Sequence, residues 1–171
     1  MGAMSNFQNF KQPITMILYP NNVGLAYVIC QGMKDVIDEG IQKIAPYSDK
    51  KVMRHIRYYL DYAQPDIVIL RDHHNEHAQF SVKRKKIMKK IEETARAKNL
   101  QVHQYTRKQI KQVFEQFGGK SKFAIARQIA SWYPHLKLKL PRYRRLQDSE
   151  HYQMGVFDSY ALMITHYYLN D

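Results

Sequence analysis

Short apolar runs separated by turn signals organise the first part of the chain. Residues 14–18 are almost entirely apolar, and the Tyr-Pro-Asn-Asn segment at 19–22 is typical of a turn. Residues 24–31 are rich in β-branched and aromatic side chains, and a second expected turn at 32–35 leads into a third strand over 36–44. The chain is therefore expected to open with an antiparallel meander.

Helical and strand-like patterns then alternate. The continuous apolar run at 67–70 is typical of a strand buried on both faces. The last helix is apolar nearly all round, so we expect it to pack against the sheet. The expected elements are a helix between the N-cap Ser48 and a stop at 64–66, a strand over 67–70, a helix over 80–98, a strand over 100–105, and helices over 106–114, 123–132 and 157–169. This order predicts an α/β fold with a mixed five-stranded sheet, three antiparallel strands followed by parallel ones, and helices on both faces.

Length and composition indicate one folded domain without a membrane span. The chain has 171 residues, and 44% of them are hydrophobic. The Met-Gly-Ala start is typical of a tag remnant, so we expect residues 1–13 to be that remnant with a flexible N-terminus and 14–171 to form the domain. No apolar run approaches the roughly 18 residues that a membrane span needs. The single cysteine, Cys30, cannot form an internal disulfide, which favours a cytoplasmic location.

The positive charge is concentrated in one part of the chain. The formal net charge is +12, and the segment 83–145 holds 19 of the 27 basic residues but only three of the 15 acidic ones. Such a one-sided excess is expected of a protein that binds a polyanion such as nucleic acid. A basic face that is merely solvated is the alternative.

The candidate nucleic-acid contacts are basic residues of this segment and of the loop that follows Pro141. Arginines surround Tyr143 in that loop, and no apolar periodicity there predicts that they are buried. The Gly-Gly-Lys-Ser-Lys sequence at 118–122 is able to present backbone amides and two lysines to a phosphate. The predicted contacts are Lys83, Arg84, Lys85, Lys108, Lys111, Lys120, Lys122, Arg142, Arg144 and Arg145.

Five segments carry a resemblance to a known family: residues 16–29, 65–72, 105–114, 119–122 and 155–166. In order and spacing they resemble the conserved segments of the RuvC-like Holliday-junction resolvases, within the RNase H-like superfamily. The resemblance covers nearly the whole chain from Ile14 onward. It implies an RNase H-like fold and a nuclease that hydrolyses phosphodiesters with two Mg²⁺ ions. In that mechanism, carboxylates from the first strand, the fourth strand and the last helix hold both ions.

The chain departs from the family at the metal-binding positions. Tyr19 stands where the first-strand aspartate is expected, Arg71 matches the fourth-strand glutamate, and Gly155 matches an acid that precedes the final one. Mg²⁺ requires oxygen ligands, and neither a neutral phenol nor a guanidinium cation replaces a carboxylate. Asp158 matches the final acid, and if the metals are lost we expect it to pair with Arg71 or to cap the last helix.

Three functional hypotheses follow. The first is a nucleic-acid-binding domain for branched or structured nucleic acid, DNA rather than RNA, with an eroded metal site and no cofactor. The second is an active endodeoxyribonuclease whose Mg²⁺ or Mn²⁺ ions are held by Asp72, Glu150 and Asp158. The third is a protein-interaction module with a basic face. Since RuvC relatives act as dimers, the resemblance also implies a homodimer.

The histidines include one candidate cluster of metal ligands. His73, His74 and His77 lie close together after the fourth strand, and with Glu76 they offer ligands for Zn²⁺ or another transition metal. The spacing matches no known closed site, so a polar loop is the favoured interpretation. His166, on the last helix, is expected to be a packed histidine.

Overall fold

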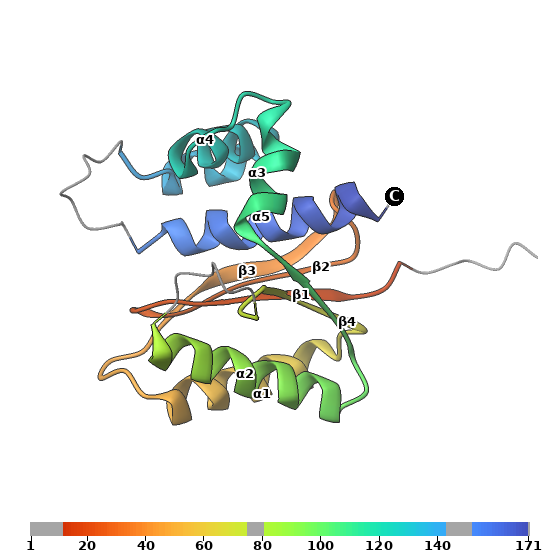
Figure 1. Cartoon of the computed structure of the whole chain (residues 1–171), viewed down its shortest axis with the longest axis vertical. Coiled ribbons are helices and arrows are strands. Elements are labelled where there is room, and N and C mark those ends of the chain that lie inside the picture. Colours follow the sequence, from red (N-terminus) through yellow and green to blue (C-terminus); the bar gives the residue numbers. More distant parts are fainter. Residues whose placement is uncertain (1–11, 75–80, 143–151, 171) are drawn as a thin grey trace, which may run out of the picture.

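The computed structural model describes residues 12–74, 81–142 and 152–170, and it shows a mixed five-stranded sheet between two layers of helices (Figure 1). The strand order is β3-β2-β1-β4-β5, with β1, β2 and β3 antiparallel and β4 and β5 parallel to β1. The predicted fold class is therefore confirmed. The elements are β1 (Thr15–Pro20), β2 (Gly24–Cys30), β3 (Val36–Lys43), α1 (Asp49–Ala63), β4 (Ile67–Arg71), α2 (Val82–Ala97), β5 (Gln101–Tyr105), α3 (Arg107–Glu115), α4 (Lys122–Trp132), the 3₁₀ helix η1 (Pro134–Lys139) and α5 (Met154–Leu169).

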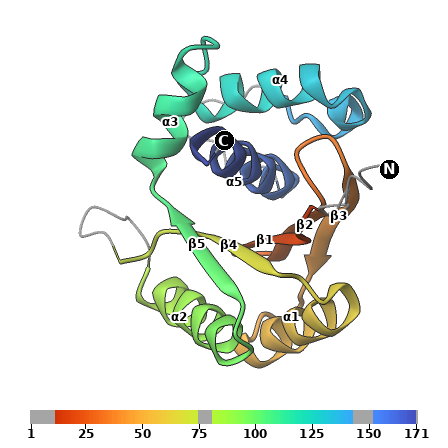
Figure 2. The ribbon, with the colours of Figure 1, turned by 90° about the vertical axis from the view of Figure 1, so that its right-hand side faces the viewer.

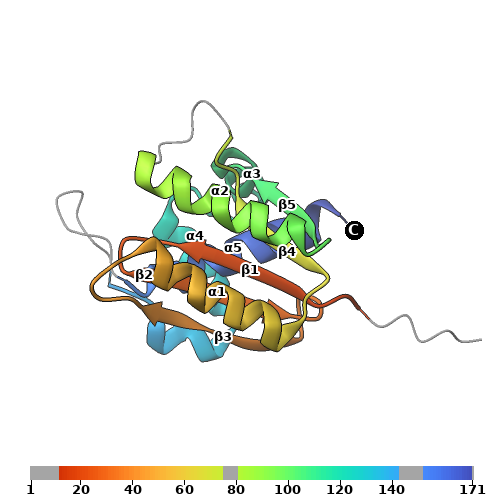
Figure 3. The ribbon, with the colours of Figure 1, turned by 90° about the horizontal axis from the view of Figure 1, so that it is seen from below.

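The central strands are buried on both faces because each face has its own core. Ile67 and Ile69 of β4 join the core beneath α5, whereas Val68 and Leu70 join the core beneath α1 and α2. Figure 3 shows α1 and α2 lying side by side across their face of the sheet. The alternation of side chains along a strand explains why β4 is one uninterrupted apolar run.

Helix α5 packs on the face of the sheet opposite to α1 and α2. Figure 2 shows it between the sheet on one side and α3 and α4 on the other. A helix covered on opposite sides must be apolar nearly all round, and residues 159–166 of α5 are all buried. The helix begins at Met154, three residues before the predicted start. Its first turn has no side-chain cap from which a start is recognisable.

The end of β1 also differs from the expectation. The strand continues through Tyr19 and Pro20, which pair with Ala26 and Leu25 of β2. The chain reverses at Asn21 instead. Its side-chain Oδ1 accepts hydrogen bonds from the backbone N–H groups of Val23 and Gly24, at 2.9 Å each. Tyr19 therefore lies on a regular strand with a defined side-chain direction.

The helix starts follow the capping rules. Ser48 and Thr106 cap α1 and α3 as predicted, Thr106 within a complete capping box, and Ser81 and Ser121 cap α2 and α4. Within the described part of the chain, no helix combines the length and apolar character of a membrane span.

Candidate nucleic-acid interface

A small pocket of about 40 Å³ lies where β1 and β4 end beside the first turns of α5, with α3 and α4 forming its outer wall. We call it the β1–β4 pocket. Its polar lining consists of Tyr19, Arg71, Arg107, Lys111, Lys122 and Asp158, and its apolar lining of Ile110, Ile125, Ala126, Met154, Phe157 and Ala161.

The sheet register brings Tyr19 and Arg71 together. β1 and β4 run parallel with Ile17 beside Ile69, and both side chains belong to the core beneath α5. Two residues further along each strand, side chains point to that same face. The pairing therefore brings into one pocket the two residues that the family resemblance matches to metal-binding positions.

Arg71 is a half-buried cation at the base of the β1–β4 pocket. Burial lowers the pKa of its guanidinium and Arg107 lowers it too, whereas Tyr19 and Asp158 favour the charged form. Arginine nevertheless stays protonated at neutral pH. The pocket thus has a permanent positive charge beneath α5.

Asp158 lies beside a second cation. Its Oδ2 atom is 3.3 Å from Nζ of Lys122, the first residue of α4. The expectation that Asp158 caps the last helix is wrong, because no side chain caps α5 and Asp158 follows its first turn. Its neighbours are Arg71 and Lys122, so its charge is compensated from two directions.

These residues do not fit a two-magnesium centre. Among the described residues that line the β1–β4 pocket, Asp158 is the only carboxylate, against four lysines and arginines. A pair of divalent ions needs several anionic oxygens to offset their charge and to supply octahedral coordination. The arrangement suits an anion with distributed oxygens, such as a phosphate group, better than it suits two metal ions.

Gly155, the position of a further family acid, has no room for a side chain. A Cβ atom there would lie 2.8 Å from Nδ2 of Asn21 and 2.9 Å from Cβ of Ala26. The glycine allows α5 to approach the end of β1 and the start of β2 closely. An acidic ligand at this position is therefore incompatible with the present packing.

The substitution Gly155→Ala is expected to lower the free energy of unfolding by about 1–2 kcal/mol, because both contacts are closer than 3.0 Å and should cost the upper part of the usual ~1–3 kcal/mol of overpacking, while helix propensity returns about 1 kcal/mol. Urea unfolding measures the change. Gly40→Ala is the control, since the three atoms nearest to a Cβ there, at 3.1–3.4 Å, all belong to the side chain of Tyr27, whose end is able to shift. A Gly155→Ala variant as stable as the parent would contradict the close packing.

Asp72, a further predicted acid, is not brought to Asp158. Asp72 is not part of the lining of the β1–β4 pocket; its Oδ1 accepts a hydrogen bond from the backbone N–H of His74 at 2.8 Å. Strand alternation accounts for this, since Asp72 follows Arg71 and turns to the opposite face. Glu150 lies outside the described residues.

Two of the predicted basic contacts line the pocket, and the other described ones lie on the surface of several elements. Lys111 and Lys122 line it, and Lys108 and Lys120 are exposed on α3 and just before α4. Lys83 and Lys85 are exposed on α2, and Arg142 is exposed after η1. Arg144 and Arg145 lie outside the described part of the chain.

A second pocket extends the first toward α2. Its volume is about 150 Å³, and it shares Tyr19, Lys122, Met154 and Asp158 with the β1–β4 pocket. Arg84 lines its far side, where its Nη2 donates to Oδ1 of Asn22 at 2.8 Å. Arg84 thus joins the cations of α3 and α4 around one connected recess.

Sequence reasoning missed Arg107, which lines the β1–β4 pocket at the start of α3. The helical spacing indicated that Arg107 accompanies Lys111, because the two residues are four apart on α3 and therefore share one helix face.

The aromatic residues of the basic segment are mostly structural. Tyr105 is buried, and its hydroxyl lies 2.6 Å from Nδ1 of the buried His166, which is a packed histidine as expected. Tyr133 donates a hydrogen bond to the backbone carbonyl of Met33. Trp132 is 40% exposed and packs edge-on against Phe117. Tyr143 is not among the described residues.

Comparison with known proteins was informative only at the level of structure. No family model matches this sequence. No curated protein matches it either. The solved structure of Thermus thermophilus RuvC is similar, with a TM-score of 0.59, 16% sequence identity, and coverage of 91% of this chain and 93% of that chain. T. thermophilus RuvC in complex with Holliday junction substrate is similar too, with a TM-score of 0.60, 15% identity and the same coverage.

This similarity extends over nearly the full length of both chains, and it shows that the protein has a RuvC-like fold of the RNase H-like type. At this level of identity the likeness concerns the fold alone. The chemistry of the site has to be argued from its own residues.

Proposed function

We propose that this protein binds branched or structured DNA with the basic surface around the β1–β4 pocket, and that the pocket holds a backbone phosphate in place of a two-metal centre. The observation that carries the proposal is the composition of that pocket. One carboxylate, Asp158, is matched by four cations, Arg71, Arg107, Lys111 and Lys122.

The charges of the pocket are suited to a phosphodiester. Two of the cations are arginines, whose planar guanidinium groups match pairs of phosphate oxygens. Lys122 and Arg71 already compensate Asp158, which leaves Arg107 and Lys111 on the exposed face of α3 to attract a further anion. A phosphate at this place would position the DNA backbone without reading its sequence.

The shape of the DNA is inferred from the fold. The similar T. thermophilus RuvC has been solved with a Holliday junction substrate. A basic surface spread over α2, α3 and α4 suits a ligand that presents phosphates from more than one direction. The homodimer that the resemblance implies remains a prediction, and light scattering of the purified chain measures it.

Removing Arg107 and Lys111 together tests the proposal. We expect the double alanine variant to bind a four-way DNA junction more weakly, and the slope of log affinity against log salt to become shallower by about 2, since each lost phosphate contact removes about 0.9. Fluorescence anisotropy with labelled junction, duplex, single-stranded DNA and structured RNA gives both quantities.

Arg54→Ala with Arg57→Ala is the matched control, because it removes the same charge from the exposed surface of α1, on the other face of the sheet (Figure 1). Equal losses in both double variants would mean that only net charge matters, and the proposed interface would be wrong. Stronger binding of RNA than of the junction would contradict the DNA assignment.

A further inference from the structure

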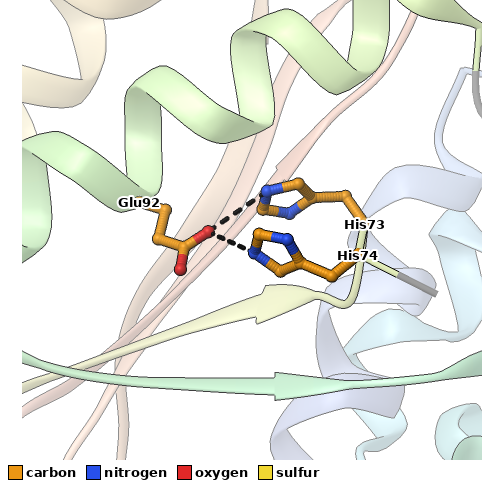
Figure 4. Close-up of side chains that lie close together, drawn as sticks. All are labelled: His73, His74 and Glu92. Atoms are coloured by element: carbon orange, nitrogen blue, oxygen red, sulfur yellow. Dashed lines mark hydrogen bonds and ion pairs between the residues drawn. The ribbon is translucent and has the colours of Figure 1, made fainter.

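A second cluster of chemically reactive side chains lies on the opposite face of the sheet from the β1–β4 pocket. His73 and His74 follow the end of β4, and Glu92 lies on α2 (Figure 4). Oε2 of Glu92 is 3.1 Å from Nε2 of His73 and 2.8 Å from Nε2 of His74. Each of the three residues offers a ligand atom, and these atoms all lie within 4.8 Å of one another.

The sequence pattern identified two of the three members of this cluster. It grouped the two histidines with Glu76 and His77, which are outside the described residues. Glu92 was missed because 18 residues separate it from His74, and the contact depends on α2 packing beside the end of β4.

His73 is the central member of the cluster. It is 7% exposed, and neither of its ring nitrogens makes a hydrogen bond of normal geometry. Its Nε2 lies 3.1 Å from Oε2 of Glu92 without hydrogen-bond geometry, and a buried imidazole in that situation is costly unless something satisfies it. Burial lowers the pKa of the His73 ring, with a smaller lowering from His74, whereas Glu92 and Asp72 raise it. Neutral imidazole is the form that binds metal ions.

The donor spacing suits a tetrahedral ion. Ligands placed about 2.0–2.1 Å from Zn²⁺ at tetrahedral angles are roughly 3.3 Å apart. The two His–Glu separations, 3.1 and 2.8 Å, are close to this value. Two imidazoles and one carboxylate form a donor set found in zinc sites with an open fourth position. His74 is 60% exposed in its side chain, so the cluster has an open side toward solvent.

Neighbouring contacts hold two of the donors in place. Arg96 contacts only the other oxygen of Glu92, Oε1, at 3.1 Å from its Nη2 atom, which leaves Oε2 directed at the histidines. Asp72 accepts a hydrogen bond from the backbone of His74 and fixes the turn after β4. Supporting contacts of this kind orient metal ligands in proteins.

We propose that His73, His74 and Glu92 form a Zn²⁺ site that links the end of β4 to α2. The site is separate from the β1–β4 pocket, where Arg71 points toward α5. It takes late first-row divalent ions, for which imidazole is a favourable ligand, rather than Mg²⁺. Its expected stoichiometry is one ion per chain.

The test is a Zn²⁺ titration of the untagged full chain in competition with a chromophoric chelator, repeated with Co²⁺ to record its visible spectrum. We expect one tight site with tetrahedral Co²⁺ bands. His74→Ala and Glu92→Gln should each weaken binding by more than about 100-fold, because loss of supporting contacts alone costs about 10–100-fold. Zn²⁺ should raise the melting temperature of the parent and not of these variants.

His135→Ala is the matched control, because His135 is an exposed histidine 2.8 Å from a half-buried glutamate, Glu39. It should bind Zn²⁺ as the parent does. His74 is exposed, so its replacement leaves the fold intact and the result interpretable. Absence of binding to the parent, or binding that survives both His74→Ala and Glu92→Gln, would overturn the proposal.

Discussion

The affinity of the protein for a four-way DNA junction is expected to fall by roughly 1,000- to 100,000-fold when the salt concentration rises from about 50 to about 200 mM. The reason is counterion release, which grows with the number of phosphates that lysines and arginines neutralise. The described members of the predicted contact set, with Arg107 and Arg71, provide enough cations for the six to ten phosphate contacts on which this estimate rests.

The measurement is a salt series of anisotropy titrations with the parent protein. Heparin is the comparison ligand, because it carries similar charge without the geometry of a junction. Binding that does not depend on salt would rule out a phosphate-based interface. Equal preference for heparin and junction would instead favour the protein-interaction module with a basic face.

The second large expected effect is a loss of folding stability when a buried side chain of α5 is removed. Phe157→Ala is expected to lower the free energy of unfolding by about 3–5 kcal/mol, the usual cost of removing a buried phenylalanine side chain. Phe157 is 1% exposed and lies on α5, which is enclosed by the sheet and by α3 and α4 (Figure 2). Little space is available for neighbouring side chains to close the resulting cavity.

Urea unfolding followed by circular dichroism measures this change. Leu169→Ala at the exposed end of the same helix is the control and should change stability by less than about 0.5 kcal/mol. Similar losses in both variants would contradict the enclosed position of Phe157. Since Phe157 also lines the β1–β4 pocket, the folded fraction of the variant should bind the junction more weakly than the parent.

Most of the fold was predictable because local pattern and tertiary burial agree. The run Ile67 to Leu70 indicated a strand buried on both faces, and α5 indicated a helix covered on all sides. The errors were at element ends, where burial rather than pattern decides. β1 continues through Tyr19 because β2 pairs with it, and α5 starts early without a cap.

The site was predictable only where strands set its geometry. The family resemblance matched Tyr19 and Arg71 to one site, and the parallel pairing of β1 and β4 brings them to the same face of the sheet. The contact of Lys122 with Asp158 joins residues 36 apart on two helices, and no local pattern indicates which lysine of a basic segment will face a given acid. The places of Arg107 in the pocket and of Glu92 beside the histidines depend in the same way on how the helices pack.

The most direct test of the central proposal is to incubate the purified protein with a labelled four-way junction in Mg²⁺, Mn²⁺ or EDTA and to measure binding and products in the same samples. The proposed arrangement predicts a salt-sensitive complex with uncut DNA in all three conditions, because Asp158 is the only described acid in a pocket of cations. Metal-dependent cleavage that Asp158→Asn abolishes would contradict it, and would show that other acids, such as Asp72 or Glu150, complete an active metal site.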